Sequence, residues 1–232
     1  MMTPQMFRVA AFGALVCTAT IGNAHYLWIE QPRQGNAIIH FGEFNEGVIE
    51  RSPGRMDEMP SIEAFAGAAP LSVTKQSDRY MLSGRVGTSA IAAQELNYPV
   101  KDWRANGIGI AKPMFYARYG AADVPKLDLD ILPSVDGSSV QVFLHGKPLA
   151  SVAFSLHAPN GWSQSGKADA QGKISVVMPW RGQYLVEVIA LEKTPGKFKG
   201  VAYDVVRQRA TLTLMQANGA ATFAVPIAAG HD

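Results

Sequence analysis

The feature that most constrains the fold of this chain is a series of short segments in which apolar and polar residues alternate. The clearest examples are residues 139–145, 152–158, 173–179, 182–190 and 210–215. Alternation with a period of two buries one face of a strand and leaves the other face in water. Turn sequences such as HGKP, APNGW and DAQGK separate these segments. Several short strands at near-regular spacing predict an all-β fold built from sandwich-like units.

The first half of the chain is less regular but also contains strand candidates. They lie at residues 36–41, 71–75, 79–84, 114–119 and 127–133. The segment SAIAAQELN, residues 89–97, is rich in good helix formers, and we expect a short helix there. Residues 43–60 form a charged segment with turn signals at SPGR, and a loop is expected there.

The linker-like sequence PSVDGSS suggests a domain boundary at residues 133–134. We therefore expect two β-sandwich-like domains. The first, residues 25–133, is a β-rich domain that carries the charged loop, and the second, residues 134–218, is a β-sandwich. The small apolar residues of 219–232 are weakly patterned, and we interpret them as a C-terminal tail.

Residues 1–24 have the pattern of a secretory signal peptide. Arg8 precedes a short apolar run, and the small residues Gly22 and Ala24 stand where a signal peptidase would cut. The sole cysteine of the chain, Cys17, lies within this segment, so the remaining chain has no disulfide and must be held by packing. We expect a periplasmic protein. No later apolar stretch approaches the length of a membrane span.

The formal net charge of the chain is +2, and it contains no long basic run. This balance argues against nucleic acid as the main partner. The sequence also has no GxSxG motif, no phosphate-binding glycine loop and no cysteine after the leader. Nucleophilic catalysis is therefore unsupported, and we expect a protein without catalytic turnover.

Cleavage after Ala24 would leave His25 as the N-terminal residue. A free α-amine and the imidazole Nδ1 of the same residue can chelate one metal ion, because both groups lose their protons near neutral pH. Nitrogen ligands suit nickel, cobalt, copper and zinc. A chance histidine at this position is the competing interpretation.

A metal at His25 would need further ligands. We single out His40, Glu43, Glu50 and Asp57 as candidates, because carboxylates and histidine form mixed nitrogen and oxygen sites. The alternative for His40 is a structural histidine on a strand face. The alternative for the carboxylates is a solvated loop in which arginines of the same segment pair with them.

Several long strings of this sequence resemble a bacterial periplasmic family of unknown function that is sometimes labelled a nickel/cobalt-uptake periplasmic component. The strings are AHYLWIE, FGEFNEGVIERSPGRMDE, PNGWSQSGKADAQGK, PWRGQYLVEV and TPGKFKGVAYDVVRQRATLTL. The resemblance implies an N-terminal histidine in the mature protein, carried here by His25. It also implies an Ig-like or transthyretin-like module, similar to carboxypeptidase-regulatory domains, at residues 134–218.

Together these features predict a periplasmic protein that binds or delivers a transition-metal ion, with nickel, cobalt or copper as the candidates. Its partner would be a metal-uptake transporter or an outer-membrane receptor. Two alternatives remain open. One is a non-catalytic β-sandwich module that docks on a secreted or outer-membrane partner through exposed strand edges. The other is a copper oxidase with a histidine brace, which needs a second histidine beside the first.

Overall fold

The computed structural model describes residues 25–31, 36–84 and 90–229. These residues form β-strands joined by turns and by three short 3₁₀ segments, η1 (Phe44–Glu46), η2 (Arg55–Glu58) and η3 (Arg104–Asn106). The described residues contain no α-helix, which confirms the predicted all-β fold class. In this part of the chain no helix has the length and apolar character needed to cross a membrane. The predicted leader, residues 1–24, lies outside the described residues.

Most of the strands belong to one mixed sheet of 14 strands. Along its main path the order is β14 (Ser163–Lys167), β13 (Ala153–His157), β16 (Gly182–Glu192), β19 (Val205–Gln216), β9 (Gly109–Tyr119), β7 (Ile91–Glu95), β4 (Glu63–Ala66), β5 (Ala69–Lys75), β6 (Tyr80–Ser83), β2 (Ile38–Glu43), β3 (Val48–Ile49) and β20 (Ala228–Ala229). In addition, β1 (Tyr26–Glu30) pairs with β2, and β8 (Lys101–Trp103) pairs with β9. Two of the pairs are parallel, β9 with β19 and β3 with β20.

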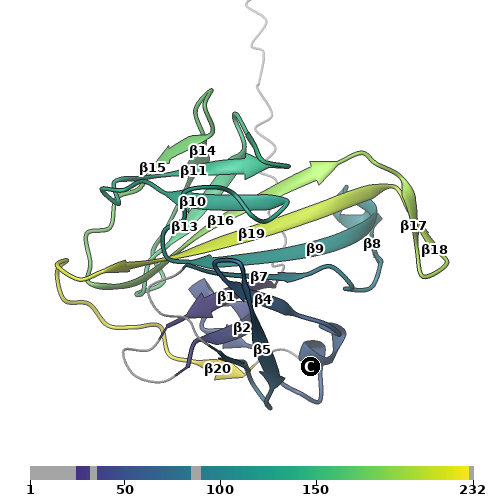
Figure 1. Ribbon diagram of the computed structural model, residues 1–232, viewed down its shortest axis with the longest axis horizontal. Coiled ribbons are helices and arrows are strands. Elements are labelled where there is room, and N and C mark those ends of the chain that lie inside the picture. The colour runs from purple at the N-terminus through teal and green to yellow at the C-terminus, as the bar shows by residue number, and fades with distance from the viewer. Residues whose placement is uncertain (1–24, 32–35, 85–89, 230–232) are drawn as a thin grey trace, which may run out of the picture.

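A smaller sheet and a hairpin complete the fold. The small sheet contains β10 (Leu129–Pro133), β11 (Ser139–Leu144), β12 (Lys147–Pro148) and β15 (Lys173–Ser175). The hairpin of β17 (Gly196–Phe198) and β18 (Val201–Tyr203) projects at one end of the molecule (Figure 1).

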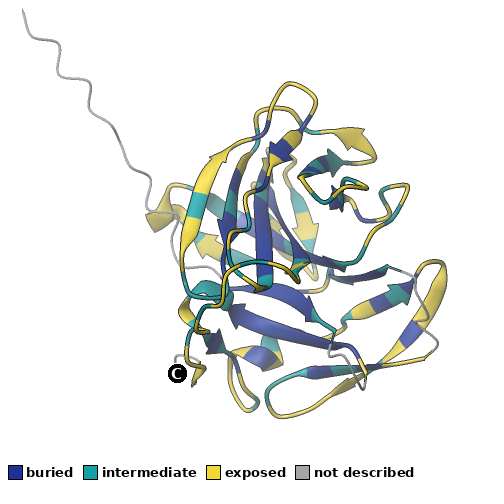
Figure 2. Ribbon diagram, turned by 90° about the vertical axis from the view of Figure 1, so that its left-hand side faces the viewer, coloured by how far each residue is buried: buried dark blue, intermediate teal, exposed yellow. Residues whose placement is uncertain are grey.

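The strands stack in three layers (Figure 1). The middle layer contains β16, β19, β9 and β7, the small sheet covers one of its faces, and β1 and β2 cover the other. Buried residues are concentrated in the strands where the layers meet (Figure 2). The first core, between the small sheet and the middle layer, includes Ile131, Val142, Tyr184, Val186 and Leu212. The second core, on the opposite face, includes Leu27, Ile39, Phe41, Phe115 and Ala117.

The middle layer joins the two halves of the chain. β9 comes from residues 25–133 and pairs with β19 from residues 134–218 over nine residue pairs, from Ala111 with Val205 to Tyr119 with Thr213. The predicted boundary at 133–134 falls between β10 and β11, which are neighbouring strands of the small sheet. That residues 25–133 and 134–218 are two separate domains stays a prediction.

The helix expected at residues 89–97 is wrong over its described part, because Ile91–Glu95 form strand β7. β7 lies between β4 and β9, and its small residues serve both cores. Ala92 belongs to the first core and Ala93 to the second. Pairing on both sides and burial on both faces therefore override the helix preference of alanine, glutamine and glutamate.

The last described segment, residues 217–229, crosses the molecule and ends beside β3. The backbone N–H of Val225 donates to the carbonyl of Pro159 at 3.0 Å, and that of Ala228 donates to the carbonyl of Gly47 at 2.8 Å. Gly47 has a φ of 67°, and a Cβ at this position would lie 2.2 Å from the carbonyl oxygen of Pro226. The close crossing therefore requires glycine at residue 47.

Candidate functional site

The site around His25 begins with the placement of strand β1. One edge of β1 pairs with β2, from Tyr26 with Gly42 to Glu30 with Ile38. The other edge receives hydrogen bonds from side chains of β19. Arg209 Nη1 donates to the carbonyl of His25 at 3.2 Å, and the hydroxyls of Thr211 and Thr213 donate to the carbonyls of Leu27 and Ile29 at 2.6 and 2.7 Å. His25 is therefore fixed at its backbone and is buried.

The hairpin of β2 and β3 brings two carboxylates to the His25 ring. Because Tyr26 pairs with Gly42 in antiparallel register, His25 lies opposite Glu43. The chain then turns, and the backbone N–H of Glu50 donates to the carbonyl of Phe41 at 2.9 Å. Glu43 and Glu50 are both buried, with 4% and 3% of their surface exposed.

The two nitrogens of the His25 ring face different groups. Nε2 makes a short contact with Glu50 Oε1, while Nδ1 lies 3.4 Å from Glu43 Oε1 and 3.4 Å from Arg55 Nη1. A carboxylate only accepts hydrogen bonds, so Nε2 carries the proton that Glu50 accepts. In the neutral ring Nδ1 then accepts a hydrogen bond from Arg55 Nη1 at 3.4 Å, and Glu43 Oε1 lies at the same distance from it. Nδ1 and the Glu43 carboxylate are both acceptors, so a positive charge near them is favourable. The guanidinium of Arg55 provides such a charge.

Burial sets the protonation state of His25. Loss of hydration lowers the pKa of the His25 imidazole below its usual value of 6.5, and the nearby guanidinium of Arg55 lowers it further. The carboxylates of Glu50 and Glu43 act in the opposite direction without reversing the shift. The neutral ring, which is the form that binds metals, is therefore favoured at neutral pH.

The other two predicted ligands lie elsewhere. His40 is buried against Trp28, with ring centroids 5.1 Å apart, and its Nε2 lies 3.2 Å from Glu30 Oε2. Asp57 is bound to Lys75, to the hydroxyl of Ser52 at 2.7 Å and to the backbone N–H of Gly54 at 2.9 Å. These hydrogen bonds, led by that of Lys75, hold the pKa of Asp57 below its usual range.

Of the five predicted ligands, the structure thus brings together His25, Glu43 and Glu50 and places His40 and Asp57 apart from them. In the arrangement described for residues 25–31, 36–84 and 90–229, no three histidine, aspartate or glutamate side chains are placed to hold one metal ion. The α-amine of a processed N-terminus would be an additional ligand beyond those side chains.

A cavity of about 230 Å³ lies beside His25, and we call it the arginine cavity. Its walls include His25, Arg55, Glu58, Lys101, Trp103 and Arg207. Arg207 is not among the residues predicted from the sequence. The signal that could have identified it is two arginines, Arg207 and Arg209, at alternate positions of a strand whose first nine residues are buried. Burial, together with the neighbouring Arg209, lowers the pKa of Arg207 to about 10.

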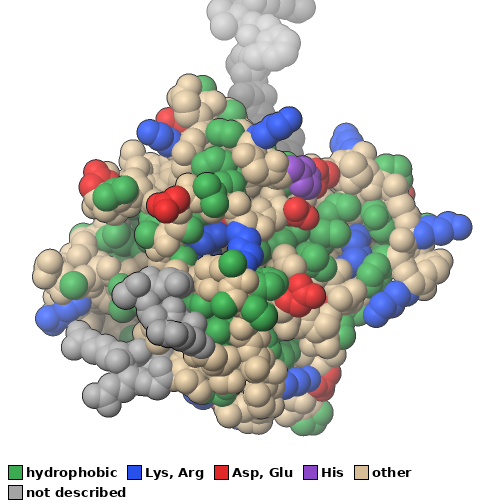
Figure 3. Space-filling view, in the orientation of Figure 1, with side chains coloured by type: hydrophobic (Ala, Val, Ile, Leu, Met, Phe, Trp, Pro, Cys, Tyr) green, Lys and Arg blue, Asp and Glu red, His purple; other side chains and the backbone are tan. Residues whose placement is uncertain are grey.

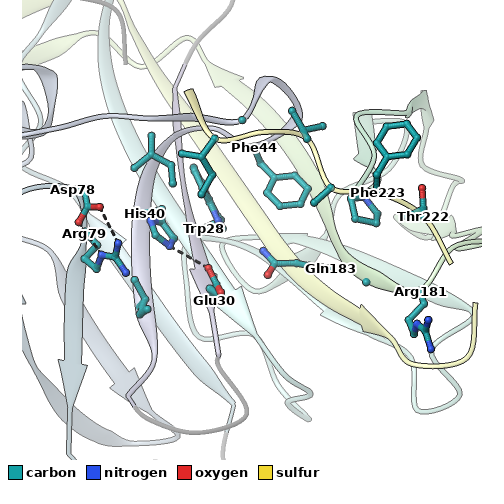
Figure 4. Close-up of a pocket in the computed structure, with 18 of the residues that line it drawn as sticks. Trp28, Glu30, His40, Phe44, Asp78, Arg79, Arg181, Gln183, Thr222 and Phe223 are labelled. Atoms are coloured by element: carbon teal, nitrogen blue, oxygen red, sulfur yellow. Dashed lines mark hydrogen bonds and ion pairs between the residues drawn. The ribbon is translucent and has the colours of Figure 1, made fainter. Parts of the chain in front are cut away.

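A second, larger cavity of about 540 Å³ is closed on one side by residues 222–227. Figure 4 shows Trp28, His40 and Phe44 between Arg79 at one end and Arg181 at the other, with Phe223 on the same side of the cavity as Arg181. The Nδ1 atom of His40 is buried and has no hydrogen-bond partner among the described residues. The face of the molecule in Figure 3 carries acidic and basic side chains that are dispersed rather than gathered into one patch.

Comparison of this chain with protein-family models, with curated protein sequences and with solved structures gives no match. Its function is therefore inferred from the residues and their geometry.

Proposed function

We propose that this protein is a periplasmic transition-metal carrier that binds nickel, cobalt or copper at a processed N-terminus beginning with His25. The ion would be cargo, passed on to a metal-uptake transporter or an outer-membrane receptor, and no catalytic turnover is involved. The observation that carries the proposal is the convergence of two buried carboxylates, Glu43 and Glu50, on the two nitrogens of the His25 ring.

The distances at this ring suit a metal site in which the α-amine and Nδ1 of His25 act together with Glu43. Two ligands bound at about 2.1 Å to one ion lie about 3.4 Å apart in a tetrahedral site and about 3.0 Å apart in the square-planar sites that copper and nickel prefer. The separation between His25 Nδ1 and Glu43 Oε1 is 3.4 Å. An ion between these atoms would take over the role of the positive charge that Arg55 contributes from one side.

Glu50 has a different role in this proposal. A metal-binding histidine commonly donates its other ring N–H to a carboxylate, which fixes the tautomer and the orientation of the ring. Glu50 on Nε2 fits this role, so Nδ1 keeps its lone pair, and an ion bound there would replace the contact of Arg55 Nη1 at 3.4 Å. Glu43 is thus proposed as a ligand and Glu50 as a positioning residue.

The test is calorimetric titration of the processed protein with Ni²⁺ and with Cu²⁺. We expect one ion per chain and binding at least 100-fold weaker when a glycine precedes His25, because the amine then no longer shares a residue with the imidazole. Glu50→Gln should weaken binding about 10- to 100-fold. His145→Gln is the matched control, since His145 is exposed and paired with Glu192. Equal affinity with and without the added glycine would contradict the proposal.

The two alternatives make different demands on the structure. A histidine brace needs a second imidazole at the ion, whereas the described side chains around the His25 ring are Glu43, Glu50, Arg55 and Phe41. A docking module would use an edge such as β14, which pairs with β13 on one side and ends the sheet. Docking would be favoured if the metal-free protein recovers one specific protein in a pull-down and a variant with a disrupted β14 does not.

A further inference from the structure

Arg207 lies just beyond the end of a regular ladder of hydrogen bonds between β19 and β1. Arg209, Thr211 and Thr213 lie on the same face of β19. Their side chains donate hydrogen bonds to every second carbonyl of the N-terminal strand, beginning at His25 and ending at Ile29. Arg207 is the next residue on that face, two positions before Arg209. The described part of the ladder ends with the carbonyl of His25. The side chain of Arg207 lines the arginine cavity instead.

Arg207 and Arg209 differ in how their charges are compensated. Both are buried, with 4% and 3% of their surface exposed. Arg209 forms an ion pair with Glu187, with Nη2 and Oε1 2.6 Å apart. Arg207 packs over the ring of Trp103 at 5.2 Å, and within the described residues no carboxylate lies at ion-pair distance from it. A buried charge without a partner is costly, and such a group is retained where something else compensates it.

The rest of the cavity adds positive charge. Arg55 and Lys101 contribute two more cations, and Glu58, the only carboxylate lining the cavity among the described residues, is already bound to Lys101 at 2.9 Å and to the hydroxyl of Tyr98. Among the described residues, the side chains that line the cavity therefore carry three positive charges and one negative charge, while Glu43 and Glu50 contact the His25 ring without lining the cavity. A guanidinium binds a planar carboxylate through two parallel hydrogen bonds, and a second carboxylate group matches the remaining cations.

We propose that the arginine cavity is a binding site for a small dicarboxylate, with Arg207 as its buried anchor and Arg55 and Lys101 at its rim. A volume of about 230 Å³ lies below the range of drug-sized sites, so the ligand is a compact one. The aromatic ring of Trp103 holds the Arg207 guanidinium from one side, as aromatic rings commonly do for cations. This site requires no metal, and it adjoins the proposed metal site, because His25 lines the cavity and Arg55 Nη1 lies 3.4 Å from His25 Nδ1.

The experiment is calorimetric titration of the metal-free protein with malonate at low ionic strength. Metal is removed with a chelating resin, because a soluble chelator is itself a polycarboxylate and would compete. We expect one malonate per chain, with acetate and the neutral malonamide each at least tenfold weaker. Equal binding of malonate and malonamide, or no binding of malonate, would overturn the proposal.

Two variants separate a ligand-binding role of Arg207 from a structural one. Arg207→Met should abolish malonate binding while the urea midpoint of the ligand-free protein stays unchanged or rises, because a buried unpaired charge is removed. Arg104→Gln is the matched control, since Arg104 is exposed and paired with Asp102, and it should bind malonate as the parent protein does. A destabilised Arg207→Met variant that still binds malonate would assign Arg207 a structural role and refute the proposal.

Failure of the two proposals can be told apart. Loss of metal binding with malonate binding intact removes the carrier function and leaves the dicarboxylate site. Metal binding without malonate binding removes the dicarboxylate site and leaves the carrier function. A malonate affinity that is unchanged by a glycine added before His25 would show that the anion site does not depend on the processed amine.

Discussion

The buried ion pair between Arg118 on β9 and Asp130 on β10 offers a sharp test of how the layers are held together. Arg118 and Asp130 have 2% and 0% of their surface exposed. Two hydrogen bonds join them, from Arg118 Nε to Asp130 Oδ1 at 2.7 Å and from Nη2 to Oδ2 at 2.5 Å. Replacing Asp130 with Asn keeps the shape of the side chain, removes its charge and leaves the guanidinium buried without a counter-ion.

The magnitude follows from the hydrogen bonds of Asp130. Besides Arg118, its Oδ2 accepts the backbone N–H groups of Lys126 and Leu127, and its Oδ1 accepts that of Ile131. An asparagine retains one oxygen, so its NH₂ group must face either two or three donors. Each buried donor left without an acceptor costs about 1–3 kcal/mol. We expect Asp130→Asn to lower the free energy of unfolding by about 3–5 kcal/mol, which is the usual cost of breaking a buried ion pair.

The assay is urea unfolding followed by tryptophan fluorescence and by far-ultraviolet circular dichroism. The double variant, Arg118→Met with Asp130→Asn, should be less destabilised than the sum of the two single variants, because it no longer leaves a charge unpaired in the core. A loss below about 1 kcal/mol for Asp130→Asn, or strictly additive costs, would refute this reasoning.

Two further predictions concern a close crossing and a surface ion pair. Gly47→Ala should destabilise the segment that ends at residue 229 by about 1–2 kcal/mol, because alanine is strained at this positive φ and its Cβ would displace Pro226. Limited proteolysis should then cut the C-terminal segment faster than in the parent protein. The hydrogen bond that His145 donates to Glu192 raises the pKa of His145 above 6.5. This pair therefore stabilises the fold fully below pH 6.5 and loses its effect as the pH rises through the folded-state pKa. Because His145 is 53% exposed, this stabilisation is below about 1 kcal/mol. The difference between the urea midpoints at pH 5.5 and pH 8.5 should therefore shrink in His145→Gln. The same difference in the variant and the parent protein would contradict the prediction.

The sequence predicts the strands of this protein better than their partners. The strand candidates identified from the sequence match about half of the strands in the described residues, because side-chain direction depends only on local backbone geometry. Residues 91–95 are an exception, because Ala92 and Ala93 are buried on opposite faces and leave no alternating pattern. The parallel pairing of β9 with β19 carries no local signal, since it joins segments about ninety residues apart.

The candidate site shows the same limit. Glu43 and Glu50 reach His25 through one hairpin, and turn signals in the charged segment made such a return plausible from sequence. The sequence could not show that Asp57 differs from these carboxylates, because Asp57 is paired with Lys75, which comes from another strand. Arg207 was missed for a related reason. Only the three-dimensional structure shows that Arg209 has a carboxylate partner and that Arg207 lies beside a cavity.

The pairing of β9 with β19 also bears on how the polypeptide reaches its final state. β19 begins at Val205, so a nascent chain has completed β9 long before its parallel neighbour exists. During that interval one edge of β9 has free backbone donors and acceptors, and such an edge invites association between molecules. Chains truncated just before residue 205 should therefore aggregate rather than remain in solution as monomers.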